Sequence, residues 1–89
     1  MQGITKNGYE YNIDDRILSD WRFVEALTEC QNGEGMKQLE GARKMVRLMF
    51  GKDYDKFMVF LAEKNEGFVP AEAVMAEITD IFENKIPKN

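Results

Sequence analysis

Histidine is absent from this sequence, and cysteine occurs only once, as Cys30. Histidine is the usual general base near neutral pH and the commonest transition-metal ligand, so its absence removes the most frequent means of catalysis and of metal binding. A lone cysteine excludes an internal disulfide and a paired-cysteine metal site, and no histidine is available to activate its thiol. We therefore expect that the chain is not an enzyme and that it binds no metal or other cofactor.

Long apolar runs and an excess of basic residues are also lacking. No stretch approaches the ~20 apolar residues of a membrane-spanning helix, and the N-terminal segment MQGITKNGYEYNIDD has no signal-peptide core. Twelve basic residues against 16 acidic ones give a net charge of −4, which disfavours contact with the phosphate backbone of nucleic acids. These features predict a cytoplasmic protein with neither a membrane nor a nucleic acid as its partner.

Periodic apolar patterning is what the sequence does contain. Hydrophobic residues make up 44% of the chain and aromatic residues 11%, enough for one modest core. Apolar positions recur at spacings of three and four, which is typical of amphipathic helices. We predict a mainly α fold in one compact domain over residues 1–89, with an N-terminal β-hairpin followed by about four short helices. The hairpin covers about 3–13, the helices about 15–30, 36–50, 53–65 and 70–84, and the tail 85–89 is expected to be loose.

The hairpin is predicted from the Asn7-Gly8 pair, which supplies the two positive φ angles of a type I′ turn. A two-residue turn places Ile4 opposite Tyr11. The alternation of a strand then directs Ile4 toward the core and Thr5 toward solvent.

Acidic residues mark the expected starts of two helices. Asp14 or Asp15 is expected to cap the first helix, and Asp53 the third, because a carboxylate can accept the backbone N–H groups that a helix start leaves unpaired. The first helix carries the only tryptophan, Trp21. A single large indole in a small helical domain is usually a core anchor and only sometimes an interface hot spot, so we expect Trp21 to be buried.

The last helix is predicted to begin at Pro70, since proline lacks the N–H that would be unpaired at the first helical position. The helical period turns Ile78 and Ile81 toward the core. It assigns Glu77 and Asp80 to the solvent side.

Six residues are candidates for partner binding. Four basic residues of the second helix form an island of positive charge, which is either a solvated face or a docking face. Methionine has a flexible thioether that suits either an irregular core or an adaptable binding surface. The candidates are Lys37, Arg43, Lys44, Arg47, Met36 and Met75.

The order of the segments carries a family resemblance. After the hairpin come Asp20-Trp21 with Glu25 and Leu27, then VRLMFG at 46–51, Tyr54, and EGFVP at 66–70. This order resembles the tail assembly chaperones of long-tailed bacteriophages, in which an Asp-Trp pair precedes a helix ending in Leu-Leu-Gly and a Gly-x-Val-Pro turn opens the last helix. Here Met49-Phe50-Gly51 takes the place of that ending, and Gly67-Phe68-Val69-Pro70 takes the place of the turn. The likeness spans Ile4 to Glu83 and consists of structural motifs, not of a chemical signature.

The resemblance implies a protein made in the cytoplasm of the infected host. Such proteins bind the long, aggregation-prone tape measure protein and help to recruit tail tube subunits around it. Family members are often absent from the finished virion and often exist also in a frameshifted, longer form. The family has no catalytic residues to carry over to this chain.

Two other functions stay open at this point. The chain could be a structural head-tail or tail component that is retained in the virion, or a bacterial regulator that binds a small effector or an RNA polymerase subunit. Self-association is compatible with both phage functions.

Overall fold

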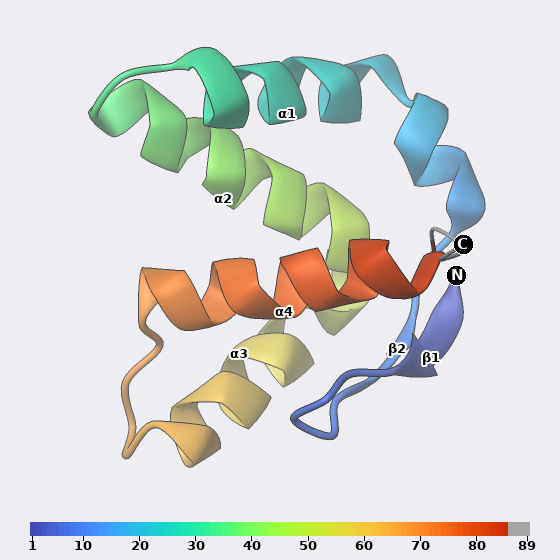
Figure 1. Ribbon diagram of the computed structural model, residues 1–89, viewed down its shortest axis with the longest axis vertical. Helices are drawn as coiled ribbons and strands as arrows, with labels where there is room; N and C mark the ends of the chain where they lie inside the picture. Colours follow the sequence, from blue (N-terminus) through green and yellow to red (C-terminus); the bar gives the residue numbers. More distant parts are fainter. Residues whose placement is uncertain (86–89) are drawn as a thin grey trace. The chain divides into compact units, whose positions relative to one another are not determined.

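The computed structural model describes the backbone of residues 1–85 and the side chains of residues 1–83. Its elements are, in order, β1 (Gln2–Ile4), β2 (Glu10–Asn12), the 3₁₀ helix η1 (Asp15–Ser19), α1 (Trp21–Asn32), α2 (Met36–Phe50), the 3₁₀ helix η2 (Gly51–Asp53), α3 (Tyr54–Lys64) and α4 (Ala71–Lys85). The fold is therefore mainly helical with an N-terminal antiparallel hairpin, as predicted (Figure 1).

The chain forms two compact units. One, here called the α/β unit, consists of Met1–Asn12 and Asp53–Asn89, and the other, the helical unit, consists of Ile13–Lys52. Each unit is described separately below. The prediction of one domain over residues 1–89 is not tested by this division.

In the α/β unit, β1 and β2 pair in a register that differs by one residue from the predicted register. Gly3 lies opposite Tyr11 and Ile4 opposite Glu10, so the prediction that Ile4 faces Tyr11 is wrong. The cause is a longer turn, in which Gly8 has a φ of +95° and donates its N–H to the carbonyl of Thr5 at 2.9 Å. A three-residue loop that ends in a left-handed glycine is a common alternative to the two-residue turn.

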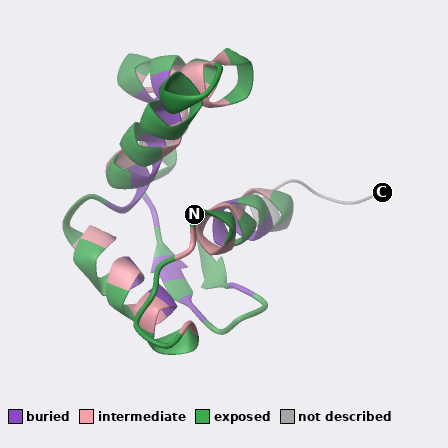
Figure 2. Cartoon of the chain, turned by 90° about the vertical axis from the view of Figure 1, so that its left-hand side faces the viewer, coloured by how far each residue is buried: buried purple, intermediate pink, exposed green. Residues whose placement is uncertain are grey.

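This shift of register reverses the two faces of β1. Ile4 is 57% exposed, whereas Thr5 is buried and its Oγ1 accepts the backbone N–H of Tyr9 at 3.1 Å. Along β2 the residues alternate exposed, buried, exposed, with Tyr11 on the buried face (Figure 2).

Helix α3 contributes apolar residues to the core of the same unit. Phe57 and Leu61 are buried, and the Tyr9 ring lies 5.0 Å from the rings of Phe57 and Phe60 between centroids. Asp53 occupies the predicted cap position, but its side chain makes no capping hydrogen bond to α3.

Helix α4 begins at Ala71, directly after Pro70, and extends to Lys85. Ile78 and Ile81 are buried as predicted. The prediction that Glu77 and Asp80 face solvent is wrong, because these side chains are only 1% and 7% exposed. The expected loose tail, from residue 86 onward, lies outside the described residues.

In the helical unit, the helix predicted over 15–30 is divided in two. Asp20 has an extended backbone, with φ −72° and ψ 126°, and lies at the junction between η1 and α1. Its N–H donates to the carbonyl of Ile17 at the end of η1, and its carboxylate accepts the N–H of Arg22 at the start of α1. Asp14 is the cap that was predicted, but of η1 rather than of α1.

Helix α2 has the predicted bounds, 36–50, and lies side by side with α1 in an antiparallel helical hairpin (Figure 1). The two helices approach closely at Gly41. A Cβ added there would lie 2.5 Å from the backbone nitrogen of Cys30 and 2.7 Å from the carbonyl oxygen of Ala26. Gly41 therefore lowers the helix propensity of α2 but permits this packing.

Candidate protein-binding surface

Trp21 is an exposed residue, contrary to the prediction that it anchors the core. It is the first residue of α1, and its side chain is 71% exposed. The Asp20 cap fixes where α1 begins, and the helical period then turns Phe23 and Ala26 inward and Trp21 outward. An exposed tryptophan is a common anchor of protein interfaces.

Five of the six predicted binding residues lie together on α2. Met36 is 69% exposed, and the four cations are exposed as well. Leu39 is 54% exposed and was not among the predicted residues, although its place three residues after Met36 on the same helix could have indicated it. These six residues, Met36, Lys37, Leu39, Arg43, Lys44 and Arg47, are called the α2 face below.

Met75 does not belong to this face. It is a half-buried residue of α4 and belongs to the α/β unit, whereas the other five candidates belong to the helical unit.

A groove of about 430 Å³ runs between α1 and α2. Ala26 and Leu48 supply apolar lining, and charged side chains from both helices line the rest of it. The lining residues are Arg22, Glu25, Ala26 and Glu29 of α1 with Lys44, Arg47 and Leu48 of α2. Basic residues of the α2 face thus border a concave surface.

One of the basic residues beside this groove, Lys44, forms an ion pair. Lys44 Nζ lies 3.5 Å from Glu29 Oε1, and both side chains are at least one-third exposed. Exposed pairs of this kind contribute little to stability, so a partner could displace this one at low cost.

Arg22 is held more firmly, by Asp20. Its Nη2 lies 2.7 Å from Asp20 Oδ2, and its Nε donates to Oδ1 at 3.1 Å. Hydrogen bonds from the Arg22 side chain, and then from its backbone N–H, lower the pKa of Asp20 from 3.8 to about 2. The same arrangement recurs between Asp14 and Arg16 at the start of η1, where the pKa of Asp14 is also lowered to about 2.

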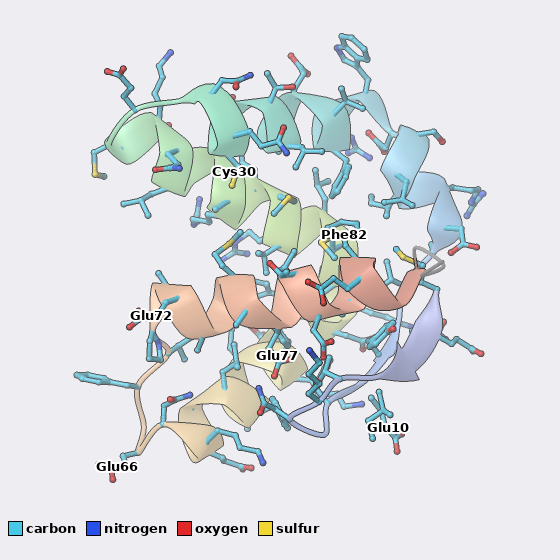
Figure 3. All side chains as sticks on the ribbon, viewed as in Figure 1. Glu10, Cys30, Glu66, Glu72, Glu77 and Phe82 are labelled. Carbon is cyan, nitrogen blue, oxygen red and sulfur yellow. The ribbon has the colours of Figure 1, made fainter. Side chains whose placement is uncertain are left out.

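A second cluster of polar residues lies in the α/β unit, where α4 meets the loop of the β-hairpin. Asp80 Oδ2 accepts the backbone N–H of Lys6 at 2.7 Å, and Glu77 Oε1 accepts the Asn7 amide at 3.2 Å. Glu77 is labelled on α4 in Figure 3. The other oxygens, Glu77 Oε2 and Asp80 Oδ1, are buried and have no hydrogen-bond partner. Among the described residues no group of three potential metal ligands is found. The two hydrogen bonds fasten the hairpin loop to α4.

The phenol of Tyr9 has an altered acidity in the same unit. Burial raises the pKa of Tyr9, and the negative charge of Asp53 adds to the effect. A shallow groove of about 350 Å³ lies beside this residue, between the hairpin and α3. Val59, which lines that groove, is 56% exposed.

Comparison with known proteins gives no relatives. No known protein family, no curated protein and no solved structure matches this chain. Within the described part of the chain, no helix has the length and apolar character needed to cross a membrane.

Proposed function

We propose that this chain is a non-catalytic protein-binding domain that acts as a tail assembly chaperone of a long-tailed bacteriophage. In this function it binds the tape measure protein and helps to recruit tail tube subunits around it. The proposal of a phage chaperone rests on the order of sequence motifs described above. The proposal of protein binding rests on the exposure of Trp21.

An exposed tryptophan carries the argument for binding because its solvent-accessible area is large and mostly apolar. Burying such a side chain against a partner removes apolar surface from water, and tryptophan is enriched among the residues that dominate binding energies. Trp21, Met36 and Leu39 are all more than half exposed within the helical unit. Methionine and leucine can adapt to several apolar partners, which suits a protein that covers a long helical chain at many places.

Co-expression with a siphovirus tape measure protein tests the proposal. The chain is expected to increase the soluble fraction of that protein and to elute with it on a sizing column. A Trp21→Ser variant is expected to lose most of this effect. A Val59→Ser variant, which alters an apolar side chain that is 56% exposed in the α/β unit, is the matched control and should retain it.

Unchanged solubility of the tape measure protein, with no complex on the column, would refute the chaperone function. Mass spectrometry of purified virions separates it from the alternative of a structural head-tail or tail component. A chaperone that leaves before maturation is absent from virions, whereas a structural component is present in stoichiometric amounts.

A further inference from the structure

The charge of α2 is opposite to that of the chain as a whole. Four basic residues and one carboxylate, Glu40, lie on α2, whereas the chain has a net charge of −4. The basic residues are exposed and gathered on one helix. Any attraction that they exert on a partner is therefore local, since the rest of the protein repels acidic molecules.

Two of these cations have no ion-pair partner among the described residues. Neither Lys37 nor Arg43 lies within 4.0 Å of a carboxylate oxygen there, and Lys44 has only its weak pair with Glu29 at 3.5 Å. Unpaired cations on a folded helix can form ion pairs with a partner without first breaking ion pairs of their own.

Apolar side chains accompany these cations. Met36 and Leu39 are exposed residues in about the first turn of α2, and the 15 residues of α2 extend over roughly 20 Å. A surface about 20 Å long that combines apolar and basic side chains is complementary to an amphipathic helix with apolar residues on one stripe and carboxylates beside it.

We propose that the α2 face binds an acidic amphipathic helical segment of a partner protein, with Met36 and Leu39 contacting its apolar stripe and Lys37 and Arg43 its carboxylates. This inference rests on the proposed function in so far as it requires a protein partner, and it specifies the chemistry of that partner. A nucleic acid is the less favoured occupant. It would offer no apolar stripe to Met36 and Leu39, and Glu25 and Glu29 line the neighbouring groove.

Three synthetic peptides of about 20 residues, long enough as helices to span the 15 residues of α2, provide the test. They share one apolar stripe of leucine and phenylalanine and carry glutamate, lysine or glutamine on the flanks. Binding to the full chain is measured by fluorescence anisotropy of the labelled peptide at low and at physiological salt. The acidic peptide is expected to bind at least tenfold more tightly than the basic one, and its affinity should fall as salt rises.

Charge-reversal variants locate the binding surface. The double variant Lys37→Glu/Arg43→Glu is expected to bind the acidic peptide at least tenfold more weakly than the parent protein. The control is Lys56→Glu/Lys64→Glu, which makes the same change in net charge on exposed residues of α3. Its affinity for the acidic peptide should stay close to that of the parent protein, with only the small decrease that a more negative net charge causes. Circular dichroism confirms that each variant is folded.

Equal affinities for the three peptides, or equal losses in the two double variants, would overturn the inference. It would also be overturned if a 20-base-pair DNA duplex bound through Lys37 and Arg43 more tightly than the acidic peptide. Light scattering of the protein without peptide provides the last check. Dimerisation through Lys37 and Arg43 would mean that a second copy of the chain occupies the α2 face, and this result would also overturn the inference.

The inference and the proposed function can fail separately. A tape measure protein that is solubilised equally by the parent and by Lys37→Glu/Arg43→Glu supports the chaperone function and refutes the role of the α2 face. Selective binding of the acidic peptide without any effect on a tape measure protein supports the α2 face and refutes the chaperone function.

Discussion

Asp80 on α4 accepts the backbone N–H of Lys6 through its Oδ2 at 2.7 Å, although the two residues are 74 positions apart in the sequence. Glu77, one turn earlier on α4, accepts the side-chain amide of Asn7 at 3.2 Å. Two buried carboxylates therefore hold the loop of the β-hairpin against the last helix. Because the Lys6 N–H lies in a partly buried position, its hydrogen bond to Asp80 contributes to the stability of the α/β unit.

Asp80→Ala is expected to lower the free energy of unfolding by about 1–3 kcal/mol, because the Lys6 N–H loses its acceptor in a partly buried position. Asp80→Asn keeps a carbonyl oxygen at the same place and should cause a smaller loss. Urea denaturation followed by circular dichroism measures both changes. If the alanine variant were as stable as the parent, the hydrogen bond to the loop would have no role in holding the hairpin.

Glu77→Gln is expected to raise the free energy of unfolding by about 1 kcal/mol. The amide oxygen can still accept from Asn7, while the substitution removes a charge from a buried site where Oε2 has no hydrogen-bond partner. Glu72→Gln, at an exposed position of the same helix, is the control and should change stability very little. A loss of stability in the first variant alone would indicate that the buried charge of Glu77 is itself stabilising.

The register of the β-hairpin can be tested at two adjacent residues. Thr5→Val should lower the free energy of unfolding by about 1–3 kcal/mol, because the Tyr9 N–H would lose the acceptor Oγ1 that lies 3.1 Å away. Ile4→Thr should be close to neutral, since Ile4 is 57% exposed. In the register with a two-residue turn the order of these effects is reversed, so chemical denaturation of both variants decides between the two.

Sequence patterns predicted the helices well but not the contacts between distant segments. The bounds of α2 were predicted correctly, and Gly35 and Gly51, which adjoin its two ends, both adopt positive φ angles. The register of the hairpin was not predicted correctly, because an Asn-Gly pair fits a two-residue turn and also the three-residue loop that is observed. A local pattern cannot choose between the two when Thr5 and Ile4 are both suited to a strand.

The candidate site was predicted only in part, because local sequence patterns do not record contacts between distant segments. Helical periodicity gave the exposure of the four cations on α2 correctly. It failed for Glu77 and Asp80, whose hydrogen-bond donors come from a loop about 70 positions away and leave no periodic signal. It also failed for Trp21, because the residue's size favoured burial whereas the cap at Asp20 sets the direction in which its side chain points.

Gly41→Ala is expected to destabilise the helical unit by about 1–3 kcal/mol, although alanine has the higher helix propensity by about 1 kcal/mol. The added methyl group would lie 2.5 Å from the backbone nitrogen of Cys30, so α1 and α2 would have to move apart. Gln38→Ala, at an exposed position of α2, is the control and should be neutral or slightly stabilising. Thermal unfolding of both variants measures the difference. A gain of stability in Gly41→Ala would mean that the two helices are not so closely packed.

The pairing of Asp20 with Arg22 makes the start of α1 sensitive to acid. The pKa of Asp20 is lowered from 3.8 to about 2, so its charged form stabilises the folded state. This contribution is fully present above about pH 4 and is lost as the pH falls toward 2, because protonation removes the acceptor of the Arg22 hydrogen bonds.

An NMR titration of the Asp20 carboxyl carbon should therefore give a midpoint near 2 in the parent protein. In Arg22→Ala it should move toward 3.8, since the side-chain hydrogen bond is the largest cause of the shift. Arg43→Ala should leave it unchanged, because Arg43 makes none of the contacts that lower this pKa. A midpoint that is the same in Arg22→Ala as in the parent would show that the cap at Asp20 functions without this arginine.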